Sequence, residues 1–73
     1  MGNTDRIISL LNEGKEVYMK DDFYDVAIRI ACGMEAYLKH KGRAEVRVPH
    51  GYKLVCEIEL GGEFIDKAEY DAY

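Results

Sequence analysis

The chain has 73 residues, of which 48 % are hydrophobic and 33 % are charged, and its formal net charge is −4. This composition excludes a disordered chain, and the length predicts one small folded domain spanning residues 1–73. No apolar run is long enough to span a membrane, and no signal-peptide pattern is present, so we expect a cytoplasmic protein with no membrane contact. In that compartment the two cysteines are more typical of reduced thiols than of a disulfide.

The first two predicted elements are short. Residues 4–13 fit a helix, because polar residues that can cap a helix precede the apolar positions and Gly14 can end it. Residues 16–20 alternate apolar side chains with charged or aromatic ones. This pattern fits a short edge strand or a plain linker, and we favour the strand.

The segment 22–41 shows a helical pattern. Its apolar residues recur at steps of three and four, and they include Phe23, Val26, Ala27, Ile30, Tyr37 and Leu38. Basic residues stand at its end, followed by Gly42, as at a helix C-terminus. Gly33 is the exception, because glycine disfavours a helix interior. We predict one continuous helix, and the alternative is a break at Gly33 that leaves two helices.

The rest of the chain alternates apolar and polar residues and predicts an antiparallel meander. Its three strands are predicted over residues 44–48, 52–60 and 63–66. A turn at 49–51 joins the first two strands, and a glycine pair joins the last two. The predicted fold is therefore α+β, with a long central helix lying on a three-stranded sheet and the N-terminal helix covering the far side of the long helix.

Catalytic, metal and cofactor motifs are absent from the sequence. Two histidines and two cysteines occur, but none of them has metal-ligand spacing, and no glycine-rich phosphate loop is present. Cys56 alternates with the polar residues of a predicted strand and is best explained as a small core residue. We therefore expect a non-enzymatic protein that needs no metal and no cofactor.

The C-terminal third is acidic and contains aromatic residues, which is typical of a protein-binding surface. The predicted partner-binding residues are Glu57, Glu59, Glu63, Phe64, Glu69, Tyr70, Asp71 and Tyr73. Such a surface can occupy a basic groove of a partner protein. Small inhibitors encoded by phages or mobile elements, including antagonists of host defence, share this size and acidity, and we take this class as the leading hypothesis.

A basic middle region supports an alternative function, nucleic-acid binding. Its candidate residues are Lys39, Lys41, Arg43, Arg47 and Lys53. If the long helix is broken at Gly33, the element order resembles a winged helix-turn-helix domain in outline. The sequence contains no helix-turn-helix pattern, and the net acidity opposes binding to phosphates.

A third hypothesis is a small homodimeric accessory subunit. On the predicted long helix, Ile28, Cys32 and Ala36 lie opposite the buried stripe and form a mildly apolar outer face. We expect residues 4–13 to cover this face within the chain, and a second copy of the chain is the alternative.

Overall fold

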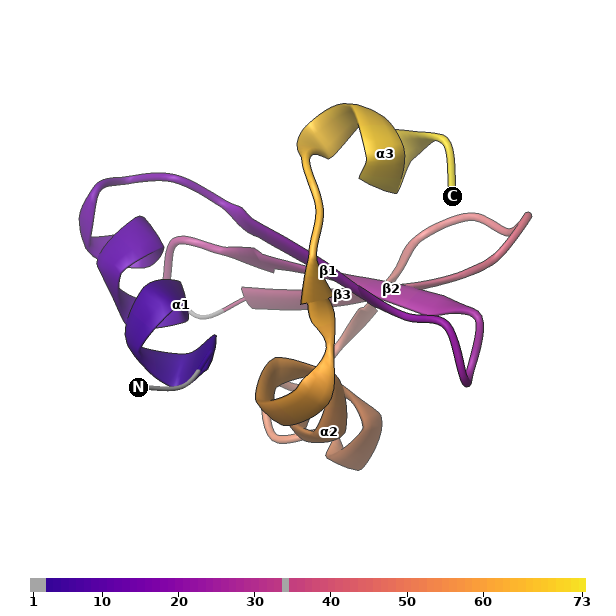
Figure 1. The fold of residues 1–73 in the computed structure, drawn as a ribbon, viewed down its shortest axis with the longest axis horizontal. Coiled ribbons are helices and arrows are strands. Elements are labelled where there is room, and N and C mark those ends of the chain that lie inside the picture. The colour runs from indigo at the N-terminus through magenta and orange to yellow at the C-terminus, as the bar shows by residue number, and fades with distance from the viewer. Residues whose placement is uncertain (1–2, 34) are drawn as a thin grey trace.

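The computed structural model describes residues 3–33 and 35–73, which form an α+β fold with one antiparallel sheet. The strand order across the sheet is β4–β3–β2–β1–β5. The strands are β1 (Val17–Asp21), β2 (Val26–Ala31), β3 (Glu35–His40), β4 (Val46–Val48) and β5 (Glu63–Phe64). The helices are α1 (Asn3–Asn12), α2 (Lys53–Gly61) and α3 (Lys67–Asp71). Of these helices, α2 and α3 lie on opposite faces of the sheet (Figure 1).

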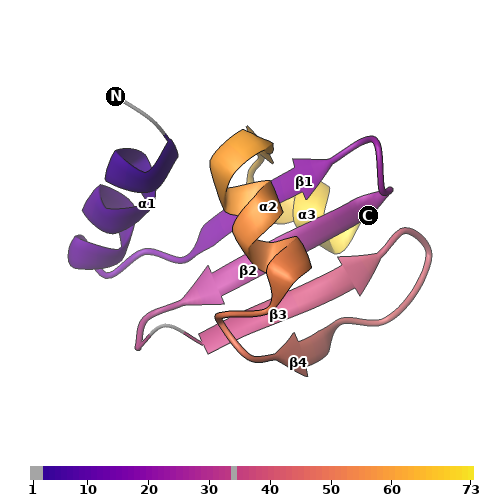
Figure 2. The same cartoon turned by 90° about the horizontal axis from the view of Figure 1, so that it is seen from below.

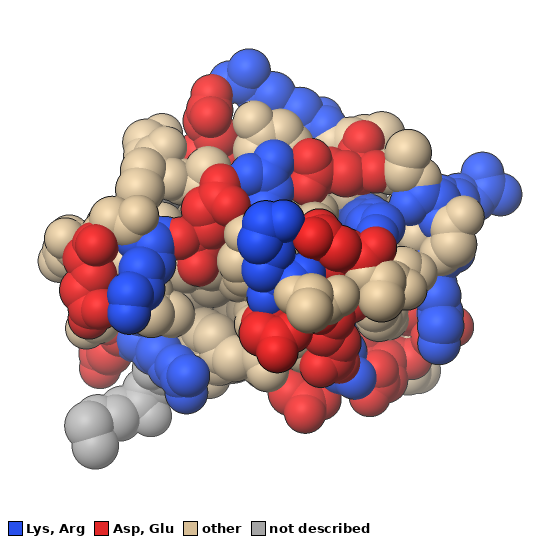
Figure 3. Space-filling model, turned by 90° about the horizontal axis from the view of Figure 1, so that it is seen from above, with Lys and Arg blue, Asp and Glu red and all other residues tan. Residues whose placement is uncertain are grey.

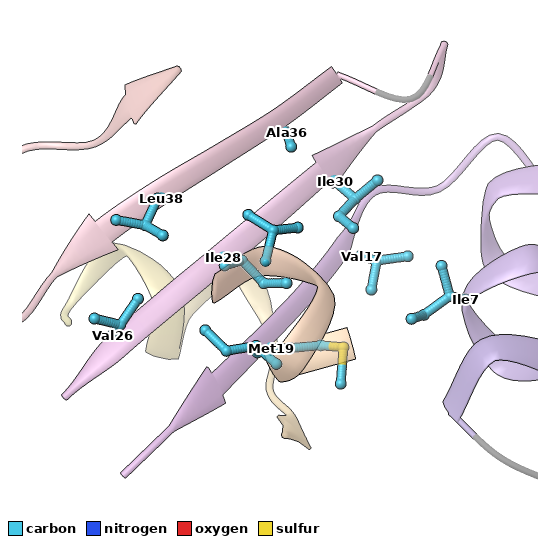
Figure 4. Packing of buried hydrophobic residues seen from close by; sticks show 10 residues of the cluster. Ile7, Val17, Met19, Val26, Ile28, Ile30, Ala36 and Leu38 are labelled. Carbon is cyan, nitrogen blue, oxygen red and sulfur yellow. The ribbon is translucent and has the colours of Figure 1, made fainter. Parts of the chain in front are cut away.

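The core lies between the α2 face of the sheet and the helices α1 and α2 (Figures 2 and 4). Strand residues on this face pair across the sheet, for example Met19 with Ile28 and Ile28 with Leu38. Helix α1 contributes Ile7, and α2 contributes Val55 and Ile58. We call this side the inner face and the α3 side the outer face.

The predicted long helix over residues 22–41 is wrong, because the described residues of this segment form strands β2 and β3. Met34, within the predicted helix, lies outside the described residues. Val26, Ile28 and Ile30 alternate along β2 and are all buried, as expected for a β-branched strand on a core. Ala27 is also buried, on the face that α3 covers. Since both faces of β2 are covered, its apolar residues follow one another closely and resemble a helical stripe.

Gly33 and Gly42 have left-handed backbone conformations, with φ of 86° and 77°. The prediction that Gly33 lies inside a helix is therefore wrong, because it lies in the turn between β2 and β3. Gly42 ends an element as predicted, but that element is strand β3. Both positions need a residue that tolerates positive φ.

The predicted strand over residues 52–60 is also wrong, because this segment forms helix α2. The apolar residues of this segment fit the two-residue period of a strand and also the period of a helix. In the structure Val55 and Ile58, three residues apart, are buried, whereas Leu60 is 74 % exposed. A strand would have placed Leu60 and Ile58 on one face. The turn at 49–51 does exist, since the Tyr52 amide donates to the Pro49 carbonyl at 3.0 Å, but it leads into the helix.

The remaining elements match the prediction in part. Helix 4–13 is confirmed as α1, and strand 16–20 is confirmed as β1. Strand β1 is not at an edge, because it lies between β2 and β5. The predicted strands at 44–48 and 63–66 shorten to β4 and β5, and these form the two edges of the five-stranded sheet, not parts of a meander with 52–60. Helix α1 packs on α2 and β1.

Candidate protein-interaction surface

The turn between β1 and β2 presents two aromatic rings to solvent. The Asp21 carboxylate accepts hydrogen bonds from the amides of Phe23, at 2.8 Å, and Tyr24, at 3.4 Å, which fixes the turn from within. Asp25 completes the turn with a φ of 52°. Phe23 is 85 % exposed, Tyr24 is 46 % exposed, and their rings meet edge to face with centroids 4.9 Å apart. The rings are therefore held outward by an ordered turn.

Carboxylates surround this turn. The ammonium group of Lys20 lies 3.1 Å from Glu69, 3.7 Å from Asp22 and 4.0 Å from Glu63. We call the following group the acidic–aromatic end: Lys20, Asp21, Asp22, Phe23, Tyr24, Asp25, Glu63 and Glu69. It holds five carboxylates and one ammonium, a formal charge of −4 that equals the charge of the whole chain, so the remaining charges of the sequence balance.

The electrostatics of nearby groups agree with this excess of negative charge. Burial raises the pKa of Tyr73, and the carboxylates of Asp25 and Asp22 raise it further because they disfavour a phenolate. A hydrogen bond to Glu69 raises the pKa of Lys20, since it favours the charged ammonium. Lys20 thus lies among several carboxylates. Their negative electrostatic potential favours the approach of a cationic group.

The residues predicted for partner binding do not form one surface. Glu63 and Glu69 meet at Lys20, within the acidic–aromatic end. Phe64 is half-buried under the Arg6 guanidinium, and Tyr70 is buried. Three others lie elsewhere: Glu57 is exposed on α2, Glu59 pairs with His50, and Asp71 pairs with Lys67. Tyr73, half-buried near Lys41, borders the acidic–aromatic end.

Sequence reasoning missed Phe23, because the helical pattern placed this side chain in a buried stripe. The residues next to Phe23 in the sequence do indicate an exposed turn. An aromatic pair flanked by Asp21, Asp22 and Asp25 is typical of an exposed turn, where aspartate side chains bond to the backbone.

The predicted basic residues are also dispersed. The Lys39 ammonium donates to the carbonyls of Tyr70 and Asp71, at 3.0 and 2.9 Å, and so ties α3 to the sheet. Arg47 pairs with Glu35 at 3.3 Å. Lys41 and Arg43 lie in the turn after β3, where Lys41 borders the acidic–aromatic end, and Lys53 begins α2 on the inner face. The described residues of the segment proposed for a helix-turn-helix form strands β2 and β3 and not two helices.

The predicted oligomer face does not exist as a surface. Ile28 and Ala36 are buried in the core, and only Cys32 is exposed, in the turn after β2. These three residues share one face only if the segment is a helix, because they are four residues apart. In strands, Ile28 and Ala36 point to the inner face, which α1 and α2 cover.

A second polar cluster, around Arg29, lies on the outer face. The Arg29 guanidinium binds Glu45 through two nitrogens at 2.9 and 3.0 Å, binds Glu16 at 2.6 Å, and stacks on Tyr37 at 4.0 Å from the ring centroid. Glu45 also accepts from the Tyr70 hydroxyl at 2.7 Å. Figure 3 shows acidic and basic side chains interspersed over this face. Since the charged groups are paired with one another, we interpret this cluster as structural.

Thiol and imidazole groups do not assemble a nucleophilic pair in the described residues. The Cys56 sulfur lies 3.9 Å from the backbone carbonyl of His50, and the His50 ring instead contacts the Glu59 carboxylate at 3.0 Å. Within residues 3–33 and 35–73, no group of three or more potential ligands could hold a metal ion.

Comparisons with protein-family models, curated proteins and solved structures gave no match to this chain. Within the part of the chain that the structure describes, none of the helices has the length and apolar character needed to cross a membrane.

Proposed function

We propose that this chain is a small, non-enzymatic protein-binding module that acts by occupying a basic surface of a partner protein. The observation that carries the proposal is the acidic–aromatic end, where Phe23 is 85 % exposed in an ordered turn among five carboxylates. A module of this kind inhibits its partner by excluding other ligands from the same basic surface. This role fits an inhibitor or host-defence antagonist encoded by a phage or mobile element.

An exposed phenylalanine supports this proposal because its ring gains from burial in a partner. Exposed apolar side chains gathered at one site mark interaction surfaces, and aromatic residues often dominate the binding energy. The turn also lowers the entropic cost of binding, since hydrogen bonds to Asp21 already fix the backbone of Phe23 and Tyr24.

The surrounding charge supports a basic partner. Carboxylates around the aromatic pair attract a positively charged surface during encounter and disfavour acidic surfaces. Nucleic acid would be repelled from this end for the same reason. The expected complex therefore has Phe23 in an apolar pocket and the acidic rim on surrounding lysine or arginine side chains.

Affinity capture followed by quantitative binding tests the proposal. The immobilised chain is used to capture a partner from an extract of its native cell, and the purified partner is then titrated against variants. We expect Phe23→Ala to weaken binding at least about tenfold and Asp22→Lys with Glu69→Lys to abolish it. Glu57→Lys is the matched control, because Glu57 is an exposed acid on α2, on the opposite face of the sheet.

Two results would overturn the proposal. One is a partner whose affinity for the chain is unchanged by Phe23→Ala and by the double charge reversal. The other is tight binding to random DNA that weakens steeply with salt and is lost on changing Arg43 and Lys53, which would favour the nucleic-acid hypothesis.

A further inference from the structure

A groove with an apolar floor lies between α1 and α2, away from the acidic–aromatic end. Its volume is about 270 Å³, and its lining includes Ile7, Ile8 and Leu11 from α1 and Glu59 from α2. The β1–β2 turn lies at the other end of the long axis of the molecule from α1 (Figures 1 and 2). The groove is thus spatially separate from the surface proposed above.

The floor of the groove has apolar area that the fold leaves uncovered. Ile7 is buried beneath it, whereas Ile8 remains 51 % exposed and Leu11 is half-buried. The volume is close to the lower limit for small-molecule sites, so it suits a ring or a short alkyl group.

One wall of the groove carries a shielded carboxylate. The Glu59 side chain is only 15 % exposed, and one of its oxygens lies 3.0 Å from the Nε2 of His50. Among the residues that line the groove, Glu59 alone carries a formal charge when histidine is counted as neutral. A ligand that enters the groove meets this carboxylate together with the His50 ring, and the pair carries a formal charge of −1 when histidine is counted as neutral.

We propose that this groove is a binding site for a compact organic cation, with an apolar body on Ile7, Ile8 and Leu11 and an ammonium group at Glu59. Charge complementarity selects this class, because a cation compensates the formal charge of the Glu59–His50 pair, whereas a neutral molecule does not and an anion is repelled. A partly shielded carboxylate also binds an ammonium more strongly than a fully hydrated one does.

Three probes of similar shape test the site: 2-phenylethylammonium, neutral 2-phenylethanol and anionic phenylacetate. Each is titrated into the ¹⁵N-labelled chain and followed by amide chemical shifts. We expect the cation to bind with a dissociation constant on the order of 1 mM, with shifts centred on α1 and α2. The alcohol should bind at least about fivefold more weakly, and phenylacetate should not bind.

Variants separate the charge from the apolar floor. Glu59→Gln should abolish the preference for the cation over the alcohol, whereas Glu57→Gln, two residues away on the same helix and exposed, should preserve it. Ile8→Ser should weaken the binding of cation and alcohol alike, and it should keep the fold because Ile8 is half-exposed. The amide spectrum of each variant reports its folding directly.

The proposal is overturned if Glu59→Gln leaves the preference for the cation intact or if the three probes bind equally. Shifts centred on residues 20–25 would also overturn it, because they would show general attraction of a cation to the acidic–aromatic end. If Glu59→Gln does not fold, the unchanged affinity of Ile8→Ser for the cation is the result that overturns the site.

Discussion

Arg29 makes the densest set of polar contacts on the outer face. Its side chain is 21 % exposed, and its guanidinium joins Glu16, before β1, to Glu45, before β4. Glu45 in turn accepts from Tyr70 on α3. One side chain on the central strand β2 thus links the sheet, the loop before β4 and the C-terminal helix.

Removing this guanidinium should destabilise the fold. We expect Arg29→Ala to lower the free energy of unfolding by about 2 kcal/mol, because the Glu16 and Glu45 side chains, 35 % and 32 % exposed, would lose the cation that joins them. Urea unfolding followed by circular dichroism measures the change. Arg47→Ala is the control, since Arg47 is 68 % exposed and pairs only with Glu35, and its loss should be below about 0.5 kcal/mol. Equal losses in the two variants would contradict the structural role of Arg29.

Glu45 should give stability a specific dependence on acid pH. Its hydrogen bonds to Arg29, and secondarily to Tyr70, lower the pKa of this carboxyl below its ordinary value. The unfolded state therefore binds more protons than the folded state in this range, so the stabilisation is present above pH about 4.5. It is lost as pH falls through the folded-state pKa. Unfolding free energies measured between pH 7 and 3 should fall less steeply for Glu45→Gln than for the unchanged chain; parallel curves would refute this assignment.

At the scale of elements, the junction between α2 and β5 contains Gly62, which among the described glycines has the closest atoms around a Cβ position. A Cβ on Gly62 would lie 2.6 Å from the Ile58 carbonyl oxygen and 2.9 Å from the Lys20 carbonyl oxygen. The Gly62 amide also donates to the Ile58 carbonyl and so ends the helix. Close backbone approach, and not positive φ, therefore requires glycine here.

Adjacent glycines provide a matched test of this junction. Gly62→Ala should destabilise the fold by about 2–3 kcal/mol, because backbone atoms would have to move apart. Gly61→Ala should be neutral or stabilise by up to about 1 kcal/mol, since nothing lies within 4 Å of its Cβ and alanine favours a helix. Thermal or urea unfolding compares them. Equal stability of the two variants would show that the chain after α2 does not pass this close to the carbonyls of Ile58 and Lys20.

At the scale of the whole molecule, stability should fall from the centre of the sheet to its edges. Strand β2 pairs on both sides and is covered on both faces, whereas β4 has three residues and one free edge. We expect the hydrogen-bonded amides of β2 to exchange with solvent at least about 100-fold more slowly than those of β4. Hydrogen exchange followed by NMR measures this ratio, and similar rates in the two strands would contradict the strand order.

The distribution of charge is also a property of the whole molecule. The acidic–aromatic end accounts for the net charge of −4, and the outer face near it is paired internally. The proposed protein-binding surface and the proposed cation groove lie at opposite ends of the long axis of the molecule (Figures 1 and 2). The two sites can therefore be altered independently.

The sequence by itself determined the two N-terminal elements and the general class. Residues 3–12 and 17–21 have one dominant period each, and Gly14 takes the positive φ that its position predicted. Acidity and aromatic content led us to predict an interaction surface, but the structure disperses most of the residues named for it. Glu63 and Glu69 are the two that belong to the acidic–aromatic end.

Only the tertiary structure decided the secondary structure of residues 26–31, 35–40 and 53–61. Covering β2 on both faces buries Val26, Ala27 and Ile28 together, which removes the alternation that marks a strand. Residues 53–61 satisfy both periods, and packing of Val55 and Ile58 on the sheet selects the helix. For the same reason Phe23, which we predicted in the buried stripe of a helix, lies in an exposed turn. Local periodicity reports which residues are apolar, but the elements that cover each face determine where those residues lie.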